Sequence, residues 1–114
     1  MIYIGFSKRT HKLYAKILCK RFKHCAPVVI HGQKCYLYQF VNRNNIVKIE
    51  LNKRDLTVLK HYGWIFVKYS AKNAPQCPEK IKAITCVQFT KRFCHIQKKC
   101  VLTPYDLFRF IHDK

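Results

Sequence analysis

The spacing of hydrophobic residues divides the chain into short strands and short helices. Residues 2–6 combine β-branched and aromatic side chains, which is typical of a strand. Thr10 can cap a following helix whose apolar positions recur with the period of an α-helix through Phe22. Lysines lie between these apolar positions, so the pattern predicts an amphipathic helix with one solvated face.

A hairpin is predicted next. Residues 25–30 are apolar and contain Pro27, which has no backbone N–H and therefore favours an edge strand or a bulge. Residues 31–34 contain a glycine and predict a tight turn into a second strand over residues 35–41.

The middle of the chain continues this pattern with a strand, a helix and a further strand. Residues 42–45 carry no core residues and predict another turn, after which residues 46–51 alternate apolar and charged side chains as a half-buried strand does. Asn52 can cap a short helix that ends at Gly63, because glycine readily adopts the conformation that closes a helix. Residues 64–69 predict another strand.

Two helices are predicted in the last third, after a proline-containing surface loop at residues 70–80. Thr85 can cap the first of them, which begins at Cys86. Residues 103–106 place an N-cap threonine, a proline at the first helical position and an acid at the third. The inward-facing residues of this last helix are predicted to be Leu107, Phe108, Phe110 and Ile111.

These elements predict a single α+β domain over residues 1–114. The expected architecture is an antiparallel β meander or small barrel packed with helices at both ends of the chain. With 114 residues, of which 49% are hydrophobic and 14% aromatic, the chain can form one packed core but not two.

The chain is strongly basic, with 23 Lys and Arg against 5 Asp and Glu and a formal net charge of +18. Such a surface attracts polyanions, which include nucleic acid, an anionic membrane face and an acidic protein. Basic pairs beside Tyr and Phe suit phosphate contacts and base stacking, although a solvated basic face gives the same pattern. The charges are spread along the sequence, so sequence-specific DNA readout is not indicated. The candidate polyanion contacts are Lys20, Arg21, Lys23, Lys91, Arg92, Lys98 and Lys99.

Neither a membrane span nor a signal peptide is predicted. The longest stretch without Asp, Glu, Lys or Arg runs from His24 to Gln33, far short of the roughly 20 residues that a spanning helix needs. The first residues have no basic segment before their apolar run. We expect a soluble, cytoplasmic protein without a transmembrane segment.

Seven cysteines are many for this length, and their odd number prevents complete internal pairing. Without a secretion signal, reduced thiols are expected, some of them small core residues. No Cys-x-x-Cys pair occurs, and the five acidic residues are scattered. Neither a metal site nor another cofactor is therefore predicted.

Cys86 is the thiol whose position suggests chemistry. In the first turn of a helix, unpaired N–H groups and the macrodipole favour an anion, and the thiolate is the nucleophilic form of cysteine. His24 begins the strand after the first helix and could take a proton from Cys86. Gln39 lies on the paired strand and could orient the imidazole. Alternatively, Cys86 is a buried core thiol, His24 a histidine with a structural partner or an exposed one, and Gln39 a surface residue.

The order of these segments carries a resemblance. A strand and a helix are followed by FKHCAPVVIHGQKCYLYQF, then by ITCVQFTKR and by LTPYDLFRFI. This order resembles the circularly permuted NlpC/P60 papain-like family, including its short phage-encoded members. The resemblance implies that Cys86 is the nucleophile, His24 the general base and acid, and Gln39 the third polar residue.

Two function classes remain open from the sequence. The first, which the resemblance implies, is a cysteine peptidase or amidase type of hydrolase, or an acyltransferase, acting on a peptide-like or acyl substrate. Its location would be the host cytoplasm or the virion if the chain is phage-encoded. The second is a non-enzymatic basic module that binds nucleic acid or an acidic protein or virion surface.

Overall fold

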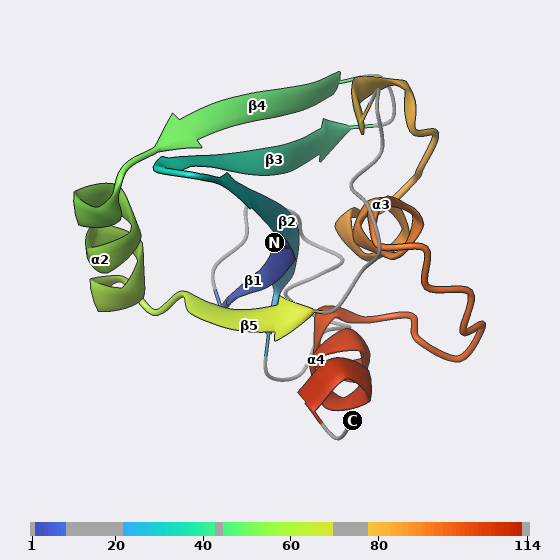
Figure 1. The fold of residues 1–114 in the computed structure, drawn as a ribbon. Helices are drawn as coiled ribbons and strands as arrows, with labels where there is room; N and C mark the ends of the chain where they lie inside the picture. The colour runs from blue at the N-terminus through green and yellow to red at the C-terminus, as the bar shows by residue number, and fades with distance from the viewer. Residues whose placement is uncertain (1, 9–21, 43–44, 70–77, 113–114) are drawn as a thin grey trace.

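Five antiparallel strands form the sheet on which the helices pack, as seen in a computed structural model that describes residues 2–8, 22–42, 45–69 and 78–112 (Figure 1). Within these residues the strands are β1 (Ile2–Ser7), β2 (His24–His31), β3 (Lys34–Asn42), β4 (Asn45–Leu51) and β5 (Ile65–Tyr69). The helices are α2 (Lys53–His61), α3 (Cys86–Phe93) and α4 (Pro104–His112), with a short 3₁₀ helix at Pro78–Lys80.

The strand order is β4-β3-β2-β1-β5, so β1 to β4 follow one another as a meander and β5 returns beside β1. The sheet curls but stays open, with β4 and β5 as its edges (Figure 1). α2 lies on one side of the curled sheet, and α3 and α4 lie on the other (Figure 1). The expectation of an α+β fold with an antiparallel sheet is confirmed.

Pro27 was expected to mark an edge strand or a bulge, and the edge-strand alternative is wrong because β2 lies at the centre of the sheet. Pro27 pairs with Ile4 of β1, whereas the pairing with β3 runs from His31–Lys34 only to Val28–Leu37. In a two-residue hairpin the pair that flanks the turn is hydrogen-bonded, and every second pair after it is as well. By this alternation the backbone of residue 27 points toward β3, so the missing N–H of proline falls where the ladder with β3 stops.

The strands predicted on either side of each hairpin turn are paired. His31 pairs with Lys34 across a turn in which Gly32 has φ +59°, a conformation that suits glycine. Asn42 pairs with Asn45 across the second turn. β4 is more exposed than its alternating pattern predicted, because it is an edge strand of the sheet.

The helix caps agree with the sequence prediction. Asn52 Oδ1 accepts from the Asp55 N–H at 2.8 Å, and Asp55 Oδ2 accepts from the Asn52 N–H at 3.0 Å. The same reciprocal pair opens α4, where Thr103 Oγ1 accepts from the Asp106 N–H and Asp106 Oδ2 accepts from the Thr103 N–H, both at 3.1 Å. Each pair satisfies backbone donors that the first helical turn leaves free. Gly63 follows α2 with φ +96°, as predicted for its C-terminal end.

The predicted helix between Thr10 and Phe22 lies outside the described residues except at its last position. Phe22 itself is fully buried, with its ring 5.4 Å from that of Phe6 and 4.9 Å from that of Phe108. The loop predicted at residues 70–80 is described only from Pro78 on.

The main core lies between the sheet and the helices α3 and α4. Its largest fully buried side chains are Phe6, Phe22, Phe40, Phe89, Phe93, Ile4 and Leu107. Burial of one such side chain contributes roughly 1.5–3 kcal/mol, so these residues fix α3 and α4 on the sheet. Of the residues expected to face inward from α4, Leu107 and Ile111 are buried and Phe108 and Phe110 are partly buried.

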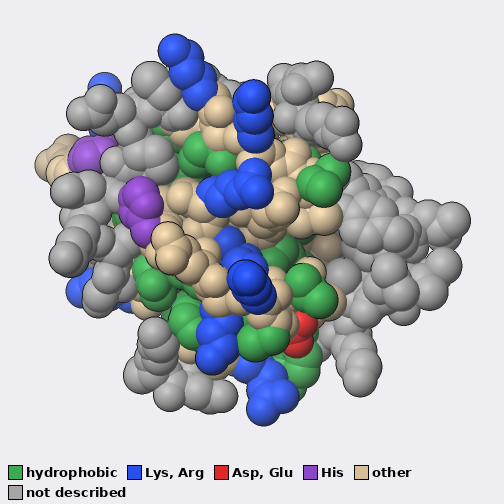
Figure 2. Space-filling view, turned by 90° about the vertical axis from the view of Figure 1, so that its right-hand side faces the viewer, with side chains coloured by type: hydrophobic (Ala, Val, Ile, Leu, Met, Phe, Trp, Pro, Cys, Tyr) green, Lys and Arg blue, Asp and Glu red, His purple; other side chains and the backbone are tan. Residues whose placement is uncertain are grey.

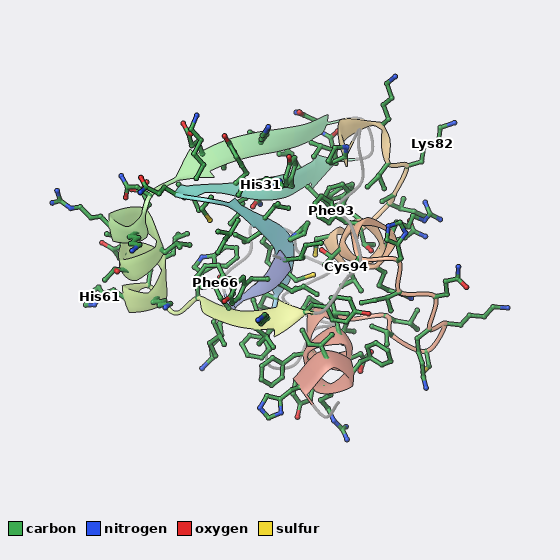
Figure 3. The ribbon with its side chains drawn as sticks, in the orientation of Figure 1. His31, His61, Phe66, Lys82, Phe93 and Cys94 are labelled. Atoms are coloured by element: carbon green, nitrogen blue, oxygen red, sulfur yellow. The ribbon has the colours of Figure 1, made fainter. Side chains whose placement is uncertain are left out.

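A second, smaller cluster lies on the opposite face of the sheet, where Ala26, Val28, Cys35 and Leu37 are buried. Side chains of α2 and of β5 and its approach pack against it, among them Leu59, Trp64 and Phe66. Figure 3 shows Phe66 between the sheet and α2. Among the described residues, the helices are too short to cross a membrane.

Candidate active site

The N-terminus of α3 presents Cys86 in its first turn, as predicted. Thr85 is the N-cap, and its Oγ1 accepts from the Gln88 N–H at 3.1 Å. Gln88 Oε1 accepts in turn from the Ile84 N–H at 2.8 Å. These two bonds fix the start of the helix and leave the Cys86 side chain at its positive end.

α3 packs mainly on β2 and also contacts β3. Figure 1 shows β2 and β3 diverging from their hairpin, with α3 on the side where they diverge. Cys86 and Cys25 of β2 belong to the same core cluster and are 7% and 1% exposed. The helix start therefore places its thiol beside the first residues of β2.

His24 and Gln39 are joined by a side-chain hydrogen bond, with 2.8 Å between the Gln39 Nε2 and the His24 Nε2 atoms. Because Nε2 of the ring is held by Gln39, Nδ1 is the nitrogen left to exchange a proton with Cys86. When Nε2 carries the proton, the side-chain amide of Gln39 can turn by half a turn so that its oxygen accepts a hydrogen bond from Nε2–H. The sequence-predicted partners Cys86, His24 and Gln39 therefore come together in the structure.

Trp64 contacts the His24 imidazole. Its ring centre lies 5.9 Å from that of His24 in an edge arrangement, and it stacks on Phe66 at 5.9 Å. Gly5 of β1 makes room for this pair, since a Cβ there would lie 2.8 Å from Phe66 Cε1 and 3.0 Å from two carbons of Trp64. Sequence reasoning missed this role of Trp64, although a lone tryptophan and a glycine inside a strand are both informative signals.

The two neighbouring thiols differ in acidity. A hydrogen bond from the Cys25 side chain lowers the pKa of Cys86 well below its ordinary value of 9.0, against the opposing effect of burial. A hydrogen bond with His24, the charge of its imidazole and the Cys25 backbone N–H lower this pKa further. Burial raises the pKa of Cys25 well above 9.0, and the neighbouring Cys86 raises it more. Cys86 is therefore the thiol of this pair that ionises first.

One further residue, Thr90, lies close to Cys86 and was not singled out in the sequence. Thr90 is fully buried, and its hydroxyl donates to the Cys86 carbonyl oxygen at 2.8 Å. The same hydroxyl oxygen lies 3.6 Å from Cys25 Sγ. The helical spacing of four between Cys86 and Thr90 was the available signal, because a threonine can bond to the carbonyl one turn earlier.

Cys94 follows the last residue of α3, whereas Cys86 is its first residue. Burial raises the pKa of Cys94 from 9.0 to about 12. The two thiols of this helix therefore differ because burial alone acts on Cys94, whereas Cys25 and His24 lower the pKa of Cys86.

The predicted basic contacts are arranged in several ways. Lys20 and Arg21 lie outside the described residues, and Lys23 precedes β2 in a bend. Lys91 Nζ donates to the Val101 carbonyl oxygen at 3.0 Å, and Arg92 donates to the carbonyl oxygen of Lys82.

The Lys91 and Arg92 side chains connect α3 to the segments before and after it. Lys98 and Lys99 are exposed, and Lys98 Nζ lies 5.9 Å from the Phe110 ring centre. Figure 2 shows Lys and Arg side chains distributed over the α3 side of the molecule, interrupted by hydrophobic side chains.

The described cysteines Cys25, Cys35, Cys86, Cys94 and Cys100 are free thiols. Within the described ranges, no group of three or more His, Cys, Asp and Glu side chains could hold a metal ion. Comparison with models of known protein families, with curated proteins and with solved structures found no match for this chain.

Proposed function

We propose that this chain is a cysteine hydrolase or acyltransferase that acts on an amide, peptide or acyl substrate through Cys86 and His24. One observation carries the proposal: a thiol at the start of α3 interacts with an imidazole of β2 that Gln39 holds at 2.8 Å. The lowered pKa of Cys86 supplies the nucleophilic thiolate, and the imidazole supplies the acid and base.

The reaction follows from these positions. The Cys86 thiolate attacks the carbonyl carbon of the substrate and forms a C–S bond, and the N–H groups of the first turn of α3 stabilise the negative charge on the oxygen. Protonated His24 then gives its proton to the leaving amine or alcohol as the C–N or C–O bond breaks. In the second half, His24 takes a proton from water or from an acceptor amine or alcohol, which attacks the thioester and releases Cys86.

The resemblance to permuted NlpC/P60 papain-like enzymes is a second support for this proposal. In that arrangement the histidine strand precedes the cysteine helix, and the cysteine lies in the first helical turn. His24 in β2 and Cys86 in α3 follow the same order here. A papain-like assignment accounts for the position of Gln39 as the residue that orients the imidazole.

A simple activated ester tests the proposal without knowledge of the natural substrate. We expect p-nitrophenyl acetate to release nitrophenol in a burst and to acetylate Cys86, as identified by peptide mapping. Cys86→Ala should lose the burst, and His24→Ala should slow acetylation at neutral pH by about 100-fold. Cys100→Ala is the matched control, since this thiol is exposed, and it should behave like the wild type. Acetylation that is independent of Cys86 or of His24 would overturn the assignment.

The alternative function is a basic binding module with an inert thiol. The observation that favours it is the net charge of +18 together with the Lys and Arg side chains on the α3 side (Figure 2). Lys98 and Lys99 are the exposed residues on which we expect this binding to depend. Nucleic acid or an acidic protein would be the partner, and salt dependence distinguishes this binding from catalysis.

A further inference from the structure

The Cys25 side chain lies in a position that catalysis by Cys86 and His24 alone does not explain. It is 1% exposed, and it lies between β2 and the first turns of α3 in the core cluster that contains Cys86. Its sulfur is 3.6 Å from Thr90 Oγ1, whose hydroxyl donates to the Cys86 carbonyl oxygen, so the Cys25 side chain lies beside the first turn of α3. Its side chain and its backbone N–H both lower the pKa of Cys86.

The direction of the Cys25 S–H follows from the hydrogen bond that the Thr90 hydroxyl donates. The hydroxyl proton of Thr90 is used in the 2.8 Å bond to the Cys86 carbonyl oxygen, so the Thr90 oxygen faces Cys25 as an acceptor. The S–H of Cys25 can then point to Thr90 while Cys86 is protonated, and to Cys86 once the latter is a thiolate. Rotation about the Cβ–Sγ bond of Cys25 is the only movement required.

We propose that Cys25 is a positioning residue whose S–H donates to the Cys86 thiolate and holds it for attack. This inference rests on the proposed function for its catalytic meaning, but the hydrogen bond that it proposes requires no substrate. Burial of Cys25 serves this role, because a thiol that resists ionisation keeps the proton that it donates.

The groups that influence the titration of Cys86 and Cys25 come from β2, from the end of α3 and from β5. His24 and Cys25 of β2 face Cys86 directly. Cys94, which follows α3, acts on Cys25, and Tyr69 of β5 interacts with Cys94. Removal of Cys25 should therefore change the titration of Cys86 directly, whereas removal of Cys94 should act only through Cys25.

The test is the pH dependence of Cys86 alkylation by iodoacetamide in the presence of a phosphine reductant, read by peptide mapping. We expect Cys25→Ala to raise the midpoint of this profile by about one pH unit, which lowers the thiolate fraction at acidic pH about tenfold. A more basic thiolate is also more nucleophilic, by about threefold per pKa unit. The variant should thus react about threefold more slowly than the wild type at low pH and about threefold faster on the alkaline plateau.

This crossing of the two profiles separates a lost donor from general damage to the site, which would lower the rate at every pH. Cys25→Ser keeps a donor at the same place and should move the midpoint back toward the wild-type value. Cys94→Ala removes an equally buried thiol and should leave the midpoint of Cys86 nearly unchanged. Circular dichroism at each pH confirms that the variants are folded.

The inference is overturned if Cys25→Ala has the wild-type midpoint, if Cys94→Ala shifts it equally, or if Cys25→Ser does not restore it. Failure of the proposed function gives a different pattern. In that case acetylation from p-nitrophenyl acetate does not depend on Cys86, while the midpoint of Cys86 alkylation still moves in Cys25→Ala.

Discussion

Gly5 links the packing of the sheet to the imidazole of the site, and its replacement by alanine tests that link. The added Cβ would lie 2.8 Å from Phe66 Cε1 and 3.0 Å from Trp64 Cε3 and Cζ3. Carbon atoms pack at about 3.5–4.0 Å, so both rings must move by about 0.5–1 Å. Trp64 lies edge-on to His24, and its displacement reaches the site.

The expected loss of stability follows from two opposing effects. Insertion of a methyl group into a packed region costs about 1–3 kcal/mol. Replacement of glycine also reduces the freedom of the unfolded chain, which stabilises the fold by about 0.4–1 kcal/mol. We therefore expect Gly5→Ala to lower the free energy of unfolding by about 1–2 kcal/mol. Alkylation of Cys86 near neutral pH should slow in parallel.

Urea unfolding followed by tryptophan fluorescence measures this change, because Trp64 is the only tryptophan of the chain. The native emission should also shift in Gly5→Ala, since the environment of the indole changes. Gly32→Ala is the control: its φ of +59° makes alanine costly by about 1 kcal/mol, but nothing lies within 4 Å of the added Cβ. A Gly5→Ala protein with wild-type stability and emission would refute the close packing described for Gly5, Phe66 and Trp64.

Two other predictions concern ionisation and charge. The pKa of Cys94 is raised to about 12 in the folded chain, so the unfolded chain loses this proton first. The stability is therefore complete below about pH 9 and falls by about 1.4 kcal/mol per pH unit as the pH rises from 9 toward 12. Cys94→Ala should flatten this alkaline decline in urea titrations, and an unchanged slope would contradict the buried thiol. The affinity for a DNA duplex should fall at least about tenfold between 50 and 200 mM salt. At a given salt concentration, the affinity should be lower when Lys98 and Lys99 are both changed to glutamate. The same charge change at Lys53 and Lys60 of α2 should have a smaller effect, and binding that does not depend on salt would exclude phosphate neutralisation.

The parts of the fold that follow from local chemistry were predicted from the sequence. The caps Asn52, Thr85 and Thr103 act on backbone groups within three residues of themselves, so their positions in the chain are sufficient information. The turn at Gly32 is local in the same sense.

The central position of β2 could not be predicted in this way. Pro27 signals a missing N–H, but the sequence does not say on which side of the strand that N–H would lie or which strand is beside it. Only the register of β2 with β1 and β3 answers both questions. The same holds for the surroundings of Cys86. Position in the sequence predicted that Cys86 lies in the first turn of a helix, whereas the places of Cys25 and Trp64 beside Cys86 and His24 depend on tertiary packing.

The interruption at Pro27 also explains how Cys86 can reach two neighbouring residues of one strand. Successive side chains of a strand point to opposite faces of the sheet, so His24 and Cys25 point in opposite directions. His24 lies with Trp64 toward the α2 side, and Cys25 lies in the core on the α3 side. Cys86 nevertheless interacts with both side chains.

If β3 paired with β2 along its whole length, β3 would lie between the two faces of the sheet at His24 and Cys25. Cys86 could then contact only one of these two side chains. From the hairpin, the pairing of β2 with β3 extends back only to Val28, so it does not include Cys25. Beyond that point, the hydrogen bond between Gln39 and His24 joins the two strands through side chains. The start of α3 can therefore approach the first residues of β2, where Cys86 interacts with His24 and Cys25 together. Pro27, which as a sequence feature argued against a regular strand, is on this reasoning the residue that gives Cys86 access to His24.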